Sequence, residues 1–265
     1  MLKYEWKNGW HMVRLRVLAG LGILIFIGNI LVNELMPMNE SMVSFGDCWL
    51  QLFLGKPEYI RTPDSEFELP VLWFLFYSYL LFLVCSYPAD DLKGIGIQGI
   101  LRCQNRQKWF LSKAVWCMEM VLLYFVAQFL IFMGSVQLYN LQNTGNQIFS
   151  SLRAFSATNM DMCTLYILPV LVGIVLCLLE LILTLISGPV VSYIIMLTYL
   201  IVSVYVNRGW LLANHAMLLR NRVLIETGRK TMNGVAECAI VCLVIILAGI
   251  TYIEKMDIIS RREQG

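Results

Sequence analysis

Residues 87–113, YPADDLKGIGIQGILRCQNRQKWFLSK, form a charged segment between two long apolar stretches of the chain. A short basic segment between two membrane spans is typical of a cytoplasmic loop. From residue 95 to residue 110, apolar and polar residues alternate with helical spacing, which predicts a short amphipathic helix at the membrane surface. Such a helix is a surface that a soluble partner can bind. The charged residues of the segment are Lys93, Arg102, Arg106, Lys108 and Lys113 against Asp90 and Asp91.

The composition indicates an integral membrane protein. Of 265 residues, 58% are hydrophobic and only 14% are charged, well below the fraction of about 25% in soluble domains. The apolar residues come in runs of about 20, the length of an α-helix that crosses a bilayer core of about 30 Å. The net charge of +2 gives no argument for a nucleic-acid partner, and we expect none.

The apolar runs predict an all-α integral membrane protein with six transmembrane helices, forming a single transmembrane domain over residues 1–265. The expected spans are about 17–32, 69–87, 114–136, 165–186, 190–206 and 235–252. Residues 1–12 mix Trp and Tyr with charged side chains, which predicts an interfacial helix before the first span. Cations before the first span place the N-terminus in the cytoplasm, and six spans return the C-terminus to the same side.

The segment before the last expected span opposes this topology. Residues 207–234 hold five cations and one acid, which the positive-inside rule would place in the cytoplasm. The segments 165–186 and 190–206 would then not form a complete hairpin. We expect residues 207–234 outside, because the other loops agree with that and the first span usually dominates. An apolar stretch at residues 45–54, too short to span, predicts a helix on the outer leaflet.

No motif in the chain predicts an enzyme. Residues 94–99 match G-x-G-x-x-G, but a membrane span precedes them instead of a strand, so the glycines fit a turn better than a nucleotide site. The pattern G-x-x-x-x-G-K-[ST] does not occur, so ATP would be bound by another polypeptide. Neither a catalytic triad nor a Cys/His cluster with metal spacing appears. We expect no catalytic, cofactor-binding or metal-binding residue in this chain.

Two carboxylates fall inside expected spans. Glu119 lies about six residues after Lys113, and Glu180 lies about seven before Ser187, so each is roughly 10 Å inside the membrane edge. A charge at that depth is costly and usually faces protein or water. Two interpretations stay open: a polar lining at the inner mouth of a pathway, or carboxylates that snorkel or hydrogen-bond to a neighbouring helix.

The cations of the charged segment also have two interpretations. They can hold the segment against an anionic membrane leaflet, or they can bind a soluble partner. Trp109, next to Lys108, would anchor the segment at the membrane surface in either case.

The layout of the chain and part of this segment carry a family resemblance. An interfacial helix, six spans, a basic loop after the second span and a long loop before the sixth resemble the permease subunits of type 2 ABC exporters of Gram-positive bacteria. The layout covers the whole chain, whereas the matching residues lie only in the charged segment. They are Tyr87-Pro88, Asp91-Leu92, Gly94, Gly96, Gln98, Leu101-Arg102, Arg106, Trp109 and Leu111-Ser112-Lys113.

The resemblance implies the membrane-spanning subunit of an ATP-driven exporter. Two permeases, expected to form a homodimer, would each bind one copy of a separate ABC ATPase, and ATP and Mg²⁺ would lie on that partner. The helix between the second and third spans would be a coupling helix that fits a cleft on the ATPase. By this match, the residues that contact the ATPase are Ile100, Leu101, Arg102, Asn105, Arg106 and Trp109.

The resemblance also implies a location and an outer structure. The protein would lie in a bacterial cell membrane, with both termini in the cytoplasm. Residues 210–222 would form short re-entrant helices on the outer side, although their cations depart from the family pattern. The pathway would be lined mainly by Leu, Ile, Phe, Met and Tyr, and the 14 methionines of the chain give adaptable apolar surface. Such a lining favours a hydrophobic or amphipathic substrate, such as a membrane-active peptide or a lipid-linked molecule.

Three other functions stay open. An ATP-independent membrane immunity or sensor protein, which binds a peptide or a lipid, would lack an ATPase partner. An intramembrane enzyme acting on lipids would need clustered catalytic groups, and we expect Glu119 and Glu180 to lack a His, Ser or metal partner. A secondary transporter often has paired halves with broken helices, and the sequence has no such internal symmetry.

Overall fold

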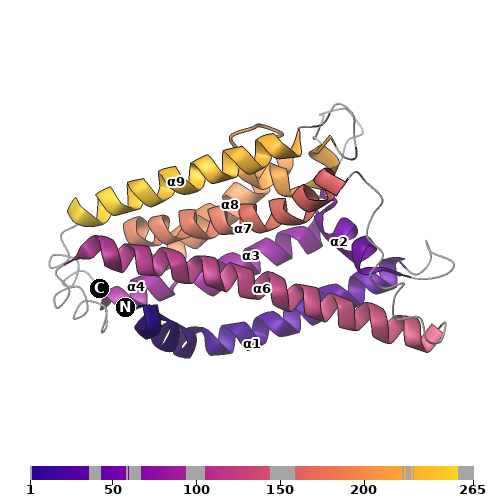
Figure 1. Cartoon of the computed structure of the whole chain (residues 1–265), viewed down its shortest axis with the longest axis horizontal. Helices are drawn as coiled ribbons and strands as arrows, with labels where there is room; N and C mark the ends of the chain where they lie inside the picture. The colour runs from indigo at the N-terminus through magenta and orange to yellow at the C-terminus, as the bar shows by residue number, and fades with distance from the viewer. Residues whose placement is uncertain are drawn as a thin grey trace.

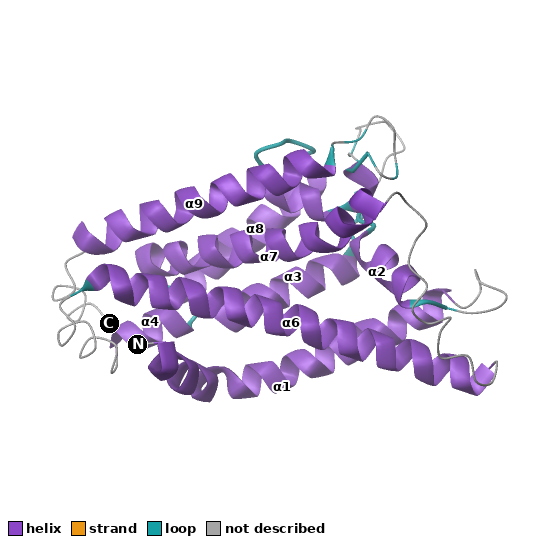
Figure 2. Ribbon diagram, viewed as in Figure 1, coloured by secondary structure: helices purple, strands orange, loops and turns teal. Residues whose placement is uncertain are grey.

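The computed structural model of the chain describes residues 2–35, 43–57, 59, 67–93, 105–143, 159–222, 224, 228 and 230–255. These residues form helices with a few connecting residues, and none of them forms a strand (Figure 2). Within this part of the chain, five helices are long and apolar enough to cross a membrane. The expected fold class is therefore confirmed as an all-α protein with several helices that can span a membrane.

Two long helices, α1 and α6, form one side of the bundle (Figure 1). α1 (Leu2–Leu35) contains the expected interfacial helix and first span as one helix, and its first turns lie at an angle to the rest. α6 (Arg106–Asn143) extends the expected third span at both ends to 38 residues, about 57 Å in length. The two helices approach closely at Gly28, where an added Cβ would lie 3.2 Å from Ser135 Oγ.

The second expected span, 69–87, corresponds to α3, and a separate short helix follows at the start of the charged segment. α3 (Val71–Val84) ends at a bend formed by Cys85 and Ser86, after which α4 (Tyr87–Lys93) begins. Pro88 lies in the first turn of α4. Backbone N–H groups in the first turn have no partner within the helix, so the missing N–H of proline costs no hydrogen bond there. The short helix α4 contacts both α1 and α7.

α7 (Asn159–Ser187) and α8 (Pro189–Tyr205) form the hairpin that the Ser-Gly-Pro sequence predicts. Gly188 between them has a φ of 86°, a left-handed conformation that glycine adopts without a Cβ clash. Pro189 suits the first turn of α8 because its φ is already helical. α8 has 17 residues, fewer than any of the five candidate spans, the second of which runs from Val71 to Leu92 through α3 and most of α4. The expected total of six spans therefore depends on α8 and stays a prediction.

The last helix, α9 (Thr231–Lys255), runs back along α7 and α6 (Figure 1). It approaches α6 closely at Gly249, where an added Cβ would lie 2.0 Å from Phe110 Cζ. The absence of a side chain at this position leaves room for the Cζ edge of the Phe110 ring beside the α9 backbone.

Short helices close one end of the bundle, which we call the α2 end; the opposite end is the α4 end. α2 (Phe45–Phe53) starts with a capping box, in which Ser44 and Asp47 satisfy each other's backbone N–H groups. The 3₁₀-helices η2 (Leu212–Ala216) and η3 (Leu218–Arg220) lie between α8 and α9 at this end (Figure 1). They occupy the sequence position at which short re-entrant helices are expected. α1 begins and α9 ends at the α4 end.

Candidate functional site

A buried carboxylate joins three helices at the α4 end. Asp91 of α4 is 0% exposed and accepts hydrogen bonds from α1 and α6. Asn8 Nδ2 donates to its Oδ1 at 3.2 Å, and Trp109 Nε1 donates to its Oδ2 at 3.2 Å. The ammonium group of Lys113, also fully buried, lies 2.7 Å from Asp91 Oδ2. We call Asn8, Asp91, Trp109 and Lys113 the α4-end cluster.

Aromatic rings enclose the ammonium group of this cluster. Lys113 Nζ lies 4.0 Å from the ring centroid of Tyr87 and 5.5 Å from that of Trp109. A cation that has both an anion and ring faces as neighbours is stabilised where water is excluded. Trp116 covers Tyr87, with ring centroids 4.2 Å apart, and Gly9 of α1 packs against both rings. The ion pair is thus held in an aromatic enclosure between α1, α4 and α6.

The cluster fixes both flanks of residues 94–104. Asp91 lies just before this stretch, and Trp109 and Lys113 lie just after it. Removing one partner of a buried ion pair typically costs about 3–5 kcal/mol, so α4 and the start of α6 are expected to move as one body. A force applied between them would therefore reach α1 as well, through Asn8.

Two of the residues expected to contact a partner lie at the start of α6. Asn105 caps this helix, because its Oδ1 accepts a hydrogen bond from the Lys108 backbone N–H at 3.0 Å. Arg106 is partly exposed, and its Nη1 donates to the Glu254 carbonyl at 3.2 Å. This bond connects the start of α6 with the end of α9. The role of both residues in binding a partner stays a prediction.

Trp109 is buried instead of lying at the surface. Its side chain is 1% exposed and belongs to the α4-end cluster, so it supports the segment from inside. The expected anchoring of Trp109 at a membrane surface, and its contact with a partner, have no support in this position. Ile100, Leu101 and Arg102 lie outside the described residues.

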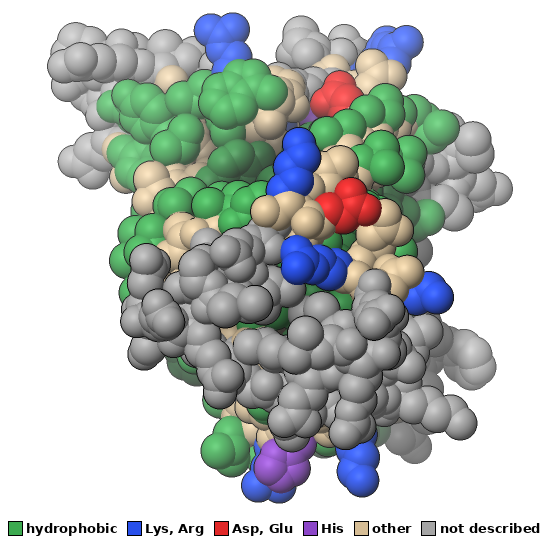
Figure 3. Space-filling model, turned by 90° about the vertical axis from the view of Figure 1, so that its left-hand side faces the viewer, with side chains coloured by type: hydrophobic (Ala, Val, Ile, Leu, Met, Phe, Trp, Pro, Cys, Tyr) green, Lys and Arg blue, Asp and Glu red, His purple; other side chains and the backbone are tan. Residues whose placement is uncertain are grey.

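Lys113 also differs from the expectation that it helps to hold a surface loop, because it is fully buried and paired. Other cations at the α4 end are exposed, among them Lys7, Lys108 and Lys255. Figure 3 views this end of the bundle, with several Lys and Arg side chains on its face. The described surface of the α4 end can therefore attract an acidic partner or an anionic leaflet.

Glu180 holds the hairpin of α7 and α8 together. It is 0% exposed, and its Oε1 accepts a hydrogen bond from Ser192 of α8 at 2.9 Å. Thr184 lies 2.9 Å from the same Ser192 hydroxyl, and its own hydroxyl donates to the Cys85 carbonyl at 3.0 Å. The expectation that Glu180 lacks a serine partner is therefore wrong, and the alternative of a bond to a neighbouring helix fits. Its role in a pathway stays a prediction.

Glu119 lies in a different environment. It is partly exposed on α6 and lies beside Trp6, Trp10 and Trp116. In the part of the chain that the structure describes, Glu119 makes no ion pair. Its place in a pathway stays a prediction.

A buried arginine organises the α2 end. Arg220 is 4% exposed and donates to the last carbonyl groups of α8, from Nη1 to Ser203 at 2.7 Å and from Nη2 to Val204 at 2.6 Å. It also donates to the side chain of Asn214 and, through Nε, to the Lys56 carbonyl at 3.0 Å. The charge satisfies the free carbonyl groups at the negative end of the α8 dipole.

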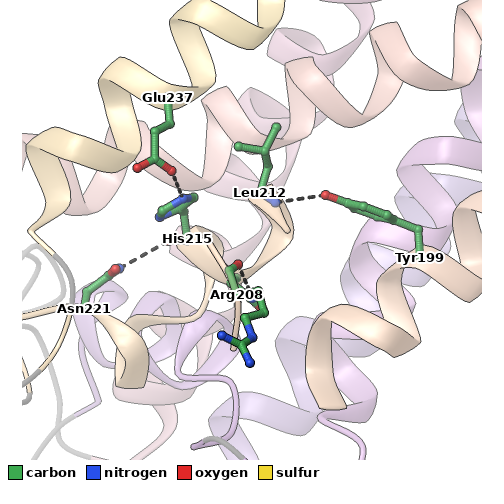
Figure 4. Close-up of polar contacts among 7 residues, drawn as sticks. Tyr199, Arg208, Leu212, His215, Asn221 and Glu237 are labelled. Atoms are coloured by element: carbon green, nitrogen blue, oxygen red, sulfur yellow. Dashed lines mark hydrogen bonds and ion pairs between the residues drawn. The ribbon is translucent and has the colours of Figure 1, made fainter. Parts of the chain in front are cut away.

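The 3₁₀-helices are tied to their surroundings by further polar contacts (Figure 4). The backbone N–H of Leu212 donates to Tyr199 Oη at 2.9 Å, which links η2 to α8. His215 Nε2 lies 2.9 Å from Glu237 Oε2 on α9, and Asn221 Nδ2 donates to the His215 carbonyl at 3.2 Å. These contacts fix the segment between α8 and α9 as part of the bundle.

An ion pair at the surface of the α2 end joins Lys56 to Glu68. The hydrogen bond from Lys56, together with its charge, lowers the pKa of the Glu68 carboxyl below its usual value. Among the described residues, no group of three or more His, Cys, Asp or Glu side chains is placed to hold a metal ion.

Sequence patterns missed most of these functional candidates. The pairing of Asp91 with Lys113 depends on how α4 packs against α6, and the sequence treats Lys113 as one of five similar cations. Arg220 is likewise one of five cations in the basic segment 207–234, and nothing in the sequence distinguishes it from the other four. The one available signal was a cation within an apolar stretch, since such a charge usually has a partner.

Comparison with known proteins gives a family without an assigned activity. No curated protein and no solved structure matches the chain. A family model described as a protein of unknown function, DUF2705, matches residues 9–259, which include the α4-end cluster apart from Asn8. Since the match covers nearly the whole chain, the protein belongs to the DUF2705 family.

Proposed function

We propose that this chain is the membrane-spanning subunit of an ATP-driven exporter, and that a separate ATPase subunit binds residues 94–104 and their flanks. The observation that carries the proposal is the α4-end cluster, in which Asp91 and Lys113 tie the two flanks together. Coupling needs a rigid element that a partner can displace. Displacement of this element would move α4 and α6 together, and with them α1.

In this proposal the α4 end lies in the cytoplasm of a bacterial cell, and α8 crosses the membrane as the fifth of the six expected spans. The exposed cations of the α4 end support this orientation. The 17 residues of α8 cover about 26 Å, and local thinning of the bilayer can accommodate so small a mismatch. An outside position for residues 207–234 is part of the proposal, and Arg220, which caps α8 from within, does not count as a loop cation against it.

The proposed substrate is a hydrophobic or amphipathic molecule, with a membrane-active peptide as the first candidate, moved out of the cell. Exposed apolar side chains along the long helices support this class, among them Phe26 of α1, Leu130 of α6 and Leu247 of α9. Two copies of the chain, as a homodimer, would enclose a path between such surfaces. ATP and Mg²⁺ would be bound by the two ATPase copies, and this chain would be no enzyme.

Co-purification tests the proposal. The tagged chain is purified from its native membrane, and the bound proteins are searched for a subunit with a G-x-x-x-x-G-K-[ST] loop. We expect this subunit with the wild type and its loss with the double variant Arg102→Glu and Arg106→Glu. The matched control is Arg208→Glu with Arg222→Glu, which reverses two charges on the opposite side of the expected membrane and should retain the partner.

The contrary result also has a defined meaning. If the folded wild type brings down no ATPase, or if reversal at residues 102 and 106 leaves binding unchanged, the segment is no coupling element. The ATP-independent immunity or sensor protein, which binds a peptide or lipid, would then be the better description.

A further inference from the structure

Glu180 is a buried acid in a candidate membrane span, and one of its two oxygens has no hydrogen-bond donor. The side chain is 0% exposed, and Ser192 of α8 donates to Oε1 at 2.9 Å. Oε2 is buried as well, and none of the described residues forms a hydrogen bond with it or an ion pair with the carboxyl group. An ionised carboxylate in a water-free place needs several donors or a cation, so this environment fits the neutral acid.

The titratable and charged groups around Glu180 supply no opposite charge. The groups that interact with it electrostatically are Cys85 at the end of α3, Cys177 of α7 and Tyr193 of α8. Thiols and phenols carry no positive charge in either protonation state. Arg16 of α1 and Asp90 of α4 lie near Cys85, and Arg16 forms no ion pair with Glu180 in the described part of the chain. From the remaining neighbours, α6 contributes Cys117 beside Cys177, and α9 contributes Tyr252, 3.5 Å from the Leu185 carbonyl.

Two hydroxyl groups connect Glu180 with the bend between α3 and α4. Ser192 Oγ lies 2.9 Å from Thr184 Oγ1, and Thr184 donates to the Cys85 carbonyl at 3.0 Å. Each hydroxyl group has one proton to donate. Since Ser192 donates to Glu180 and Thr184 donates to Cys85, neither proton is left for Oε2. The third proton of the network is therefore one that the carboxyl group carries itself.

The Cys85 carbonyl lies where the helix is interrupted. Pro88 has no backbone N–H, so in a continuous helix the carbonyl four residues earlier, at Val84, would have no donor. α3 ends at Val84, and Thr184 supplies a donor to the next carbonyl, that of Cys85. The short helix α4 follows this bend and carries Asp91 of the α4-end cluster. A change at Glu180 can therefore reach that cluster through two hydrogen bonds and the bend.

We propose that Glu180 is a proton-binding site that controls the bend between α3 and α4. With the proton on Oε2, the bend is held as in this structure. On release, the O–H bond of the carboxyl group breaks, the electron pair stays on Oε2, and the proton passes to water. The carboxylate then draws the hydroxyl protons toward itself, and the Cys85 carbonyl loses its donor. A proton needs no cavity, which suits so enclosed a side chain. The site depends on no ATPase, so it stands or fails separately from the exporter proposal.

Infrared spectroscopy of the chain in nanodiscs tests the protonation state. A neutral carboxylic acid has a carbonyl stretch that is separate from the bands of carboxylates and amides. We expect this acid band in the wild type at neutral pH and its loss in Glu180→Gln. Asp91, which is also fully buried, is ionised by its pairing with Lys113 and gives no such band. The matched control Glu119→Gln removes a partly exposed acid of α6 and should keep the band.

Hydrogen exchange tests the link to the bend. Amide exchange of residues 85–92 is followed by mass spectrometry in the wild type and in Glu180→Gln as the pH is raised, and comparison at the same pH cancels the chemical effect of hydroxide. We expect faster exchange in the wild type once Glu180 is ionised, by about fivefold, which corresponds to the loss of one hydrogen bond. Residues 71–78 of α3 are the internal control and should exchange equally in both proteins.

Four results would overturn the proposal. They are a wild type without the acid band at neutral pH, an acid band that Glu180→Gln keeps, equal exchange of residues 85–92 in both proteins at every pH, and a cation in place of the proton. The last would appear as an unfolding midpoint that rises with Na⁺ more than with choline in the wild type alone. If Glu180→Gln does not fold, Ser192→Ala decides: loss of the donor to Oε1 should shift the acid band to higher wavenumber, and an unmoved band contradicts the assignment.

Discussion

The buried carboxylate of Asp91 pairs with the ammonium group of Lys113 and accepts hydrogen bonds from Asn8 of α1 and Trp109 of α6. Asp91→Asn would leave the Lys113 ammonium without its anion in a buried place. We expect the free energy of unfolding in mixed micelles to fall by roughly 3–5 kcal/mol. The neighbouring variant Asp90→Asn is the control, because Asp90 is exposed and its loss should change stability by no more than about 0.5 kcal/mol. Equal effects of the two variants would contradict the assignment of the ion pair.

Arg220 has a similar role at the α2 end. Arg220→Met would leave the carbonyl groups of Ser203 and Val204 without their donors, at a cost of about 1–3 kcal/mol for each buried group. We expect a lower thermal unfolding midpoint in detergent, together with faster proteolysis between α8 and α9. The matched variant Arg222→Met alters an exposed arginine and should behave as the wild type. If the two arginines proved equally dispensable, Arg220 would be no cap of α8.

At the residue scale, the sequence was least informative. It left open whether Glu180 lines a pathway or bonds to a neighbouring helix, and it did not predict the hydrogen bond from Ser192 of α8. It could not pair Asp91 with Lys113, or single out Arg220, because each pairing is decided by which helix faces which. The burial of Trp109 was missed for the same reason: an amphipathic pattern indicates a face, but the neighbours of that face depend on the whole bundle.

Among the helices, the contact of α9 with α6 depends on a missing side chain. An alanine at Gly249 would place its Cβ 2.0 Å from the Phe110 ring, so the ring or the helix must shift. We expect Gly249→Ala to lower the free energy of unfolding by about 1–3 kcal/mol. Gly134→Ala in α6 is the control, because nothing lies within 4 Å of the added Cβ and alanine favours a helix. Stabilisation by both alanines would contradict the close packing of these helices.

Helices were predicted better than their ends. Long apolar runs are sufficient to indicate spans, and a glycine and a proline indicated the turn from α7 to α8. The expected span 114–136 is shorter than α6 because the polar turns at both ends carry no apolar signal, although they are helical. The short helices η2 and η3 are held by contacts with α8 that the sequence does not reveal: the Leu212 backbone N–H donates to Tyr199, and Arg220, the last residue of η3, donates to the Ser203 carbonyl.

For the molecule as a whole, the proposed orientation predicts which ends react with an impermeant maleimide. We expect Arg208→Cys to be labelled in intact cells, because this exposed position belongs to the segment between α8 and α9. Lys108→Cys, exposed at the start of α6, should be labelled only after the cells are permeabilised. The wild type, with its own cysteines, gives the background. The opposite pattern would reverse the membrane orientation and place the α4 end outside.

ATP hydrolysis by the purified assembly in nanodiscs tests the central claim most directly. If the chain is the membrane subunit of an ATP-driven exporter, the wild-type assembly hydrolyses ATP faster than its ATPase subunit does alone. Arg102→Glu with Arg106→Glu should remove this stimulation, while Arg208→Glu with Arg222→Glu should keep it. A folded wild-type chain that purifies with no ATP-hydrolysing subunit, or stimulation that survives the reversal at residues 102 and 106, would contradict the account.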